Sequence, residues 1–473
     1  MTTPIHFRTL HELASGLAAG EFSSVDLVDV FAQRIESMDS TLGAFRLPLL
    51  DAARARAAQM DAERAAGNAR GPLHGLPYVA KDLFDVAGHP TSAGCPLLED
   101  SHAERDSTVI QRLADAGMVL LGKTNTVQFA YGGAGVNSQH GTPHNPWHST
   151  HHLPGGSSSG SGVAVASGMA PMGLGTDTGG SVRIPASLCG VSGLKTTVGR
   201  ISRAGVYPLS WSLDSVGPLC RDVADTALML DALNGEDAHD YSTHGHAHEK
   251  FANCTADLNG LRIAFGETAF FDGADEQVTS AVRAAASVFE SLGASVDSIE
   301  FPEAGEALAL NPGGLVIAAE AYALNRELIE NHFDELDPVV AFRMAKGHEI
   351  TSSDYLNTVN SWNALRGRTL ERFNDIDIVL CPATMIAAKP LADAQSSIER
   401  YADLNIGYLR NTAIGNILNL CGLSIPCGHT DEGLPIGLML YARPFGERNL
   451  LRAGAAFQSA SNFHTQYPTM DWL

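Results

Sequence analysis

The chain has 473 residues, of which 44% are hydrophobic and 18% charged, so it can bury a large core and is not disordered. Lys and Arg number 31 against 53 Asp and Glu, which gives a formal net charge of −22. This acidic balance argues against binding to nucleic-acid phosphates and to an anionic membrane surface. The length alone allows two or three domains, or one large α/β core with insertions.

The start of the chain and its cysteines are typical of a cytoplasmic protein. Residues 1–6 lack the basic and apolar regions of a signal peptide. Seven cysteines, an odd number with no Cys-x-x-Cys pair, indicate reduced thiols. The uncharged stretch 411–430 is long enough to span a bilayer, but its asparagines, glycines and proline favour a buried core segment. We therefore expect a cytoplasmic location, with no membrane and no nucleic-acid partner.

The hydrophobic pattern changes along the chain. Residues 9–68 predict helices, with Ser23 and Ser24 suited to cap one of them. From about residue 76, short apolar runs alternate with amphipathic helices, which predicts an α/β fold in which helices cover both faces of a large mixed sheet. We expect residues 1–70 to form a helical segment packed on the core, and 71–473 to form one continuous domain with a surface excursion near 235–259. The apolar runs are 77–80, 118–121, 171–174, 262–265, 376–381, 423–426 and 437–440, and the clearest helices span 107–116, 222–234, 275–292, 353–373 and 446–461.

The middle of the chain contains no charged residue from Thr124 to Thr176. Residues 132–193 hold 15 of the 47 glycines. A flexible Gly/Ser linker would share this glycine content, but interleaved Val, Leu, Ile and Met residues argue against a linker. The pattern instead predicts a buried segment whose backbone packs closely against other backbone or a ligand.

Two Gly-Gly-Ser triplets in this segment end at Ser157 and Ser181, which are 24 residues apart. One helix (about 158–168) and one short strand (about 171–176) fit between them, and such a unit returns the chain so that the two hydroxyls can meet. Upstream, Lys81 ends an apolar strand. A lysine in that setting is either salt-bridged to a neighbour or desolvated with a lowered pKa.

These segments resemble the amidase signature family, whose hallmark is Gly-Gly-Ser-Ser-Gly-Gly-Ser followed by Gly-Thr-Asp-x-Gly-Gly-Ser-x-Arg-x-Pro-Ala. The matching residues here are 155–161 and 175–186, and Ser159 and Gly160 stand where many members have two glycines. Residues 75–82, 213–218 and 433–438 match further blocks of the family, so the resemblance covers roughly residues 10–465. It implies the amidase signature fold and catalysis by a serine hydrolase.

The resemblance implies a Ser-cisSer-Lys triad of Ser181 as nucleophile, Ser157 as relay and Lys81 as base. A serine hydroxyl is a weak nucleophile and needs a base within hydrogen-bond reach. Because a hydroxyl both donates and accepts, Ser157 can take the proton of Ser181 while it passes its own to Lys81. Lys81 can accept only when neutral, so burial must lower its pKa from the usual value of about 10.4.

The resemblance also implies residues around the triad. Asp177 and Arg183 flank the nucleophile, and we expect them to pin its loop rather than face the substrate. Backbone N–H groups beside Ser181 would stabilise the tetrahedral oxyanion. The expected oxyanion residues are Thr178, Gly179, Gly180 and Ser181, and the expected acyl-pocket residues are Gln128, Tyr131, Gly132 and Gly133.

Other polar clusters are expected to be structural. His140, His144 and His148 have a spacing that could place them on one helical face, but intervening glycine and prolines break such a helix. His244, His246 and His248 lie in a polar loop, and Cys189 lies in an apolar run. Ser158, Ser159 and Ser161 are typical of helix capping. We therefore expect no metal and no cofactor.

The resemblance leaves two reactions open. The first is hydrolysis of a small-molecule C–N acyl bond in an amide, anilide or carbamate, as by a urethanase, with some esters also accepted, through an acyl-enzyme on Ser181. The second is the glutaminase subunit of a tRNA-dependent amidotransferase, which needs a protein partner and an acidic group for the α-amine of glutamine. Residues 408–412 offer no carboxylate. This favours a stand-alone hydrolase, with a homodimer as an open alternative to a monomer.

Overall fold

The computed structural model describes residues 3–254 and 256–473. Within them, the strands form one mixed sheet of 11 strands in the order β1-β3-β2-β4-β6-β5-β10-β11-β9-β7-β8. Parallel pairs lie toward its two flanks, antiparallel pairs join them through the centre, and the edge strand β1 pairs antiparallel with β3. The strands are β1 (Phe45–Pro48), β2 (Pro77–Lys81), β3 (Val119–Thr124), β4 (Met172–Asp177), β5 (Ser192–Lys195), β6 (Ser215–Cys220), β7 (Ile263–Gly266), β8 (Val296–Ile299), β9 (Ile378–Pro382), β10 (Cys421–His429) and β11 (Pro435–Ala442).

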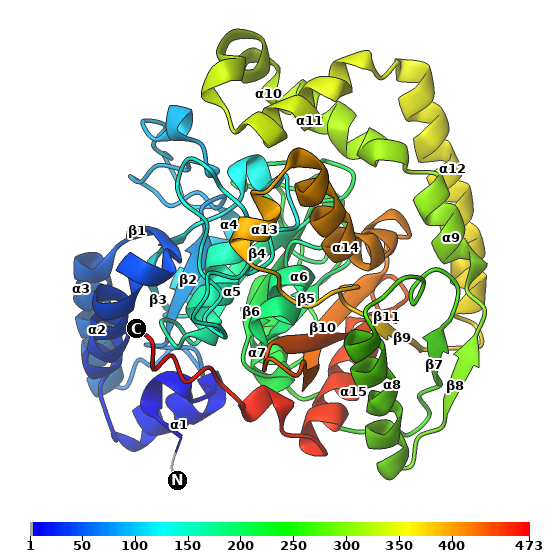
Figure 1. Ribbon diagram of the computed structural model, residues 1–473. Helices are drawn as coiled ribbons and strands as arrows, with labels where there is room; N and C mark the ends of the chain where they lie inside the picture. Colours follow the sequence, from blue (N-terminus) through cyan, green and yellow to red (C-terminus); the bar gives the residue numbers. More distant parts are fainter. Residues whose placement is uncertain (1–2, 255) are drawn as a thin grey trace.

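Helices cover both faces of the sheet, as predicted (Figure 1). Helices α2 and α3 lie beside the β1 edge of the sheet, α1 lies below them and contacts α7, and a group from α9 to α12 arches over the other side (Figure 1). The helices are α1 (Leu10–Ala19), α2 (Ser24–Leu42), α3 (Leu50–Ala65), α4 (Thr108–Asp115), α5 (Ser159–Ala166), α6 (Arg183–Cys189), α7 (Val223–Leu233), α8 (Glu276–Ser291), α9 (Pro302–Ala309), α10 (Leu315–His332), α11 (Pro338–Ala345), α12 (Ser352–Arg372), α13 (Leu391–Ala394), α14 (Ile398–Ile417) and α15 (Glu447–Ser459).

The N-terminal segment does more than add helices. Ser23 caps α2 in a capping box with Asp26, because each side chain binds the backbone N–H of the other residue. Strand β1 then pairs with β3, so this segment also supplies the edge of the sheet. The division of the chain at residue 70 stays a prediction.

The serines at the start of α5 differ from the expectation. None of them caps the helix, because the neighbouring strand offers closer partners. Ser158 Oγ lies 3.3 Å from the carbonyl oxygen of Thr176, and Ser161 Oγ donates to the carbonyl oxygen of Leu174 at 2.9 Å. These hydroxyls therefore join α5 to β4, while Ser159 Oγ has no partner within the described residues.

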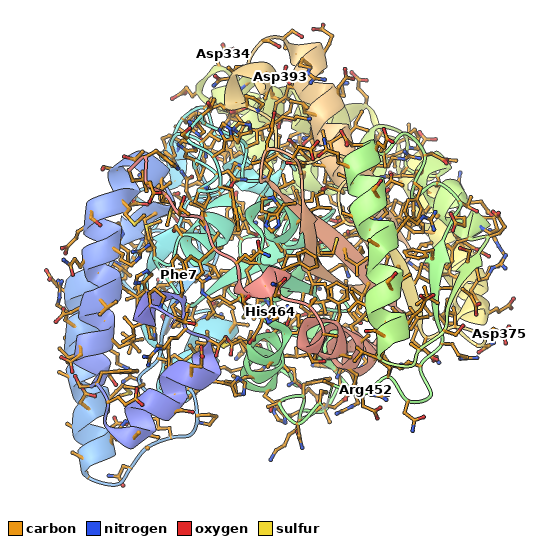
Figure 2. The ribbon with its side chains drawn as sticks, turned by 60° about the horizontal axis from the view of Figure 1, so that its bottom comes forward. Phe7, Asp334, Asp375, Asp393, Arg452 and His464 are labelled. Atoms are coloured by element: carbon orange, nitrogen blue, oxygen red, sulfur yellow. The ribbon has the colours of Figure 1, made fainter. Side chains whose placement is uncertain are left out.

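The periphery carries much of the acidic charge, as Asp334 and Asp375 on the outside illustrate (Figure 2). The stretch 411–430 forms the end of α14 and the whole of β10. No single helix among the described residues is long and apolar enough to cross a membrane, while one pair bent by 47°, Pro302–Ala309 with Pro312–Glu335, has that length and composition. In the predicted excursion 235–259, outside residue 255, the only regular helical element is a single 3-10 turn, Tyr241–Thr243.

Candidate active site

Lys81 lies at the end of β2, where the sheet and α5 bury it completely. Its Nζ lies 2.8 Å from Ser157 Oγ and 2.8 Å from Thr176 Oγ1. The peptide bond between Gly156 and Ser157 is cis. The structure thus brings together two of the three predicted triad residues, and it adds Thr176, which was not expected to take part.

The environment of Lys81 favours the neutral amine. Burial lowers the pKa of Lys81 to about 7, although the charges of Asp214 and Asp177 oppose this shift. Asp82, the adjacent carboxylate, instead pairs with Lys123 at 2.5 Å. Among the described residues, Lys81 Nζ has hydrogen bonds only to hydroxyl oxygens, so no carboxylate holds it in the charged form.

Ser181 follows β4 and lies beside the loop of Ser157. The backbone N–H of Ser158 donates to the carbonyl oxygen of Ser181 at 3.2 Å, which places the two serine loops in contact. Ser181 is 4% exposed. Within the described part of the chain its Oγ makes no hydrogen bond, so the structure does not show the predicted link to Ser157. Such catalytic contacts often tighten only when substrate binds.

The loop before Ser181 presents free backbone donors. Of the backbone hydrogen bonds that the described residues make, none uses the N–H groups of Thr178, Gly179, Gly180 or Ser181. Gly180 has a φ of +140°, a conformation that favours glycine. The Thr178 hydroxyl donates to Asp214 Oδ1 at 2.5 Å and anchors the start of the loop. The arrangement is suited to an oxyanion hole.

Asp177 and Arg183 are both fully buried and bind each other. Arg183 Nε and Nη2 donate to the two carboxylate oxygens of Asp177 at 3.0 and 2.9 Å. Arg183 also donates to Tyr441 and Asn416, at 2.7 and 2.6 Å. The charge of Arg183 overcomes the effect of burial and lowers the pKa of Asp177 to about 2. This pairing joins the end of β4 to the start of α6, and the role of the two residues in pinning the nucleophile loop stays a prediction.

We expect Arg183→Met to lower the free energy of unfolding by about 3–5 kcal/mol, because it leaves Asp177 buried without its cation. Urea unfolding followed by circular dichroism measures this loss. Arg326→Met removes an exposed partner of Glu330 and should cause no measurable change. Equal stability of Arg183→Met and the wild type would show that the pair does not hold the loop.

The four predicted acyl-pocket residues lie in different surroundings. Gln128 is buried. Its Nε2 donates to Gln139 Oε1 at 2.6 Å, and its Oε1 accepts from the N–H of Asp337 at 2.9 Å. The ring of Tyr131 is covered by a guanidinium 4.2 Å from its centroid. Gly133 approaches the triad, because its carbonyl oxygen accepts from the N–H of Gly156 at 2.8 Å. Acyl binding by Gln128, Tyr131, Gly132 and Gly133 stays a prediction.

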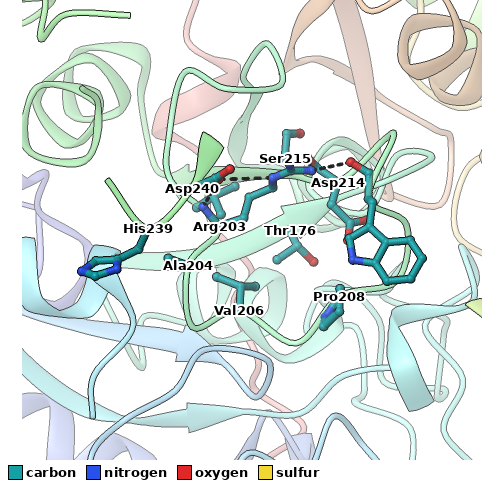
Figure 3. Close-up of a pocket in the computed structure, with 11 residues that line it drawn as sticks. Thr176, Arg203, Ala204, Val206, Pro208, Asp214, Ser215, His239 and Asp240 are labelled. Carbon is teal, nitrogen blue, oxygen red and sulfur yellow. Dashed lines mark hydrogen bonds and ion pairs between the residues drawn. The ribbon is translucent and has the colours of Figure 1, made fainter. Parts of the chain in front are cut away.

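A cavity of about 220 Å³ adjoins this site (Figure 3). Its wall includes Thr176, whose hydroxyl binds Lys81, and Asp214 beside the nucleophile loop. Arg203 also lines it, with Nε 3.4 Å from Asp240 Oδ2 (Figure 3). Thr176 and three neighbouring lining residues, 214–216, lie in blocks that match the family, whereas the rest of the wall carries no sequence signal.

The remaining polar clusters have internal partners. His140 Nε2 lies 2.9 Å from Glu99 Oε1, and His144 Nε2 lies 2.9 Å from the carbonyl oxygen of His148. No group of three or more His, Cys, Asp or Glu residues in the described ranges could hold a metal ion. Cys189 is buried, and its Sγ lies 3.3 Å from the carbonyl oxygen of Pro154. Burial raises the pKa of its thiol, so it is poorly suited to act as a nucleophile.

Comparison with known proteins identifies the family. The sequence profile of the family described as Amidase matches residues 26–451. The chain belongs to the amidase signature family. A relative in this family, "Amidase" from Pseudomonas putida, is 37% identical over 469 residues, which cover 98% of each chain.

Other amidase signature relatives have different names. A glutamyl-tRNA(Gln) amidotransferase subunit from Roseiflexus sp. (strain RS-1) is 37% identical over 495 residues, covering 99% of each chain. Among solved structures, native peptide amidase from Stenotrophomonas maltophilia superposes with a TM-score of 0.85 and 29% identity, covering 99% of this chain and all (100%) of that one. The family and fold are therefore shared by proteins that are named for different activities.

Proposed function

We propose that this chain is a stand-alone serine hydrolase that cleaves a C–N acyl bond in a small amide, anilide or carbamate. Ser181 is the nucleophile, Ser157 the relay and Lys81 the base. The observation that carries the proposal is the 2.8 Å contact between Lys81 Nζ and Ser157 Oγ, inside a fully buried site where no carboxylate of residues 3–254 or 256–473 pairs with the lysine. A neutral amine in this position can accept the relay proton.

The reaction proceeds by two acyl transfers. Ser181 Oγ attacks the carbonyl carbon, its proton moves to Ser157, and the proton of Ser157 moves to Lys81. The free N–H groups of the nucleophile loop stabilise the oxyanion. When the C–N bond breaks, the proton returns through Ser157 to the leaving amine. Water then attacks the acyl-enzyme in the same way, which releases the acid and restores Ser181.

The proposed substrates share one electrophilic carbonyl. A carbamate reacts by the same steps and gives a carbamoyl- or carbonyl-enzyme, so urethanase activity belongs to the same proposal, as does cleavage of some esters. The steps need no cofactor. Cytoplasmic location and a homodimeric state stay predictions.

The second candidate is the glutaminase role, and the relatives named as amidotransferase subunits favour it. The helix face beside the nucleophile argues against it. Leu409 of α14 lies next to Gly133 and Gly179. A Cβ added to Gly133 would lie 2.6 Å from the leucine side chain, and one added to Gly179 would lie 3.4 Å from it. A leucine cannot bind the α-amine of glutamine, whereas an apolar side chain suits an uncharged acyl group.

A hydrolysis panel on the purified chain separates the two candidates. It compares p-nitroanilides, primary amides and carbamates with glutamine, and measures kcat/KM for each. The proposal predicts turnover of at least one of the first three classes by the chain alone, with glutamine a poor substrate. Glutamine hydrolysis that needs an added partner, with no turnover of the other classes, would contradict it.

We expect Ser157→Ala to reduce kcat by a factor on the order of 10² or more, because Ser181 remains but loses its proton relay. Steady-state kinetics on the best panel substrate measures the loss. Ser167→Ala is a matched control, since Ser167 is buried and its Oγ donates to the carbonyl oxygen of Val163 instead. A near-normal rate for Ser157→Ala would show that Lys81 acts on Ser181 without the relay.

A further inference from the structure

Helix α14 contacts both serine loops with one face. Asn405 Oδ1 accepts a hydrogen bond from the N–H of Gly133 at 2.8 Å, and the carbonyl of Gly133 binds Gly156, the residue before the relay serine. About two turns further along the helix, Thr412 reaches the nucleophile loop. Residues 405, 409 and 412 have the spacing of one helical face, so a single rigid element touches both loops.

The contact of Thr412 is close and specific. Its Oγ1 lies 2.7 Å from the carbonyl oxygen of Gly179 and 2.9 Å from that of Leu409. The next residue, Gly180, packs directly against the same side chain, because a Cβ there would lie only 2.2 Å from Thr412 Oγ1. Thr412 therefore lies against the Gly179–Gly180 peptide from one side.

The orientation of this peptide determines where its N–H points. In a planar trans peptide the C=O and N–H bonds point in opposite directions. When the carbonyl of Gly179 is held toward α14, the N–H of Gly180 points away from α14, and this N–H has no partner among the described residues. Two consecutive glycines otherwise allow the peptide to rotate easily.

We propose that Thr412 is a positioning residue whose hydroxyl fixes the Gly179–Gly180 peptide and thereby aims the N–H of Gly180 at the developing oxyanion. This inference rests on the proposed function, because it needs an acyl-transfer transition state at Ser181. The inference adds Thr412 to the site, a residue 233 positions away from Gly179 along the chain. Thr412 acts through the peptide and does not touch the reacting atoms.

The test uses Thr412→Val, which keeps the shape of the side chain and removes the donor. We expect kcat to fall about 10- to 100-fold with KM nearly unchanged, because a misaimed donor affects the transition state more than bound substrate. The inhibition constant of a boronic acid that forms a tetrahedral adduct on Ser181 should rise by a similar factor. Thr412→Ser keeps the hydroxyl and should restore most of the activity.

Two further variants make the result specific. Thr412→Ala removes the donor without adding bulk and should match Thr412→Val, so the test survives if the valine variant does not fold. Thr369→Val is the matched control, since Thr369 is fully buried on α12 and its Oγ1 donates only to the carbonyl oxygen of Leu365. It should keep wild-type kcat and boronic acid binding.

The outcomes separate this inference from the proposed function. Wild-type protein that hydrolyses none of the panel substrates contradicts the proposed function itself. An active wild type with Thr412→Val and Thr412→Ala both within about twofold of its kcat would overturn the role of Thr412 and leave the function standing. Equal losses in Thr412→Ser and Thr412→Val would also overturn it, because packing rather than the hydroxyl would then be responsible.

Discussion

Ser181→Ala should abolish turnover of every panel substrate and prevent adduct formation with a fluorophosphonate. The alanine leaves the loop donors and Lys81 in place but removes the oxygen that attacks the carbonyl carbon of the substrate. We expect a loss of at least about 10⁴-fold, since removal of a nucleophile leaves only catalysis by the oxyanion hole and binding. Intact-mass spectrometry after incubation with the fluorophosphonate measures the adduct directly.

Ser159→Ala is the matched control for this experiment. Ser159 lies in the same glycine-rich segment, is fully buried, and its Oγ has no partner within the described residues. The control should react at the wild-type rate. An adduct that persists on Ser181→Ala, or that peptide mapping assigns to Ser157, would show that the wrong serine has been named as nucleophile.

Lys81→Arg should lose at least about 10²-fold in kcat at neutral pH, because a guanidinium stays protonated at every usable pH and cannot accept a proton. Lys81→Ala should show a similar loss but regain part of its rate at high pH, where hydroxide replaces the missing base. Steady-state kinetics from neutral to alkaline pH measures both effects.

A second buried lysine provides the control for size and charge. Lys195 is fully buried, and its Nζ donates to the carbonyl oxygens of Thr196 and Leu420 at 3.0 and 2.9 Å. Lys195→Arg introduces the same larger cation away from the serines and should keep the wild-type pH profile. A Lys81→Arg enzyme that works with modest loss would show that Lys81 is a permanently charged structural group.

Much of the fold follows from the hydrophobic pattern, and the exceptions have physical reasons. The long amphipathic helices α8 and α12 lie within one residue of their predicted bounds at each end. Strand β6 was not predicted, because Gly217 and Pro218 interrupt it and both residues are uncommon inside strands. Its tertiary pairing with β4 over the full length of the strand outweighs that local preference.

The motifs predict the candidate site, but not the contacts that come from distant parts of the chain. Local spacing shows that Ser157 and Ser181 can meet. It does not show that Asp82 pairs with Lys123, or that the described part of the chain offers Lys81 Nζ hydroxyl partners only. Because these contacts depend on how separate strands lie side by side, they emerge only from the folded structure.

The pH dependence of wild-type kcat/KM tests the central claim most directly, namely that a neutral Lys81 is the base. Since burial lowers the pKa of Lys81 to about 7, the protonated form dominates below that pH and the active neutral form above it. Because Lys81 is coupled to the serines, the apparent pKa that the profile gives belongs to the whole site. We predict that kcat/KM rises with pH through an apparent pKa near this value and that Lys81→Ala lacks this limb. A rise centred near the ordinary lysine pKa of about 10.4, or the same limb in Lys81→Ala, would contradict the proposed role of Lys81.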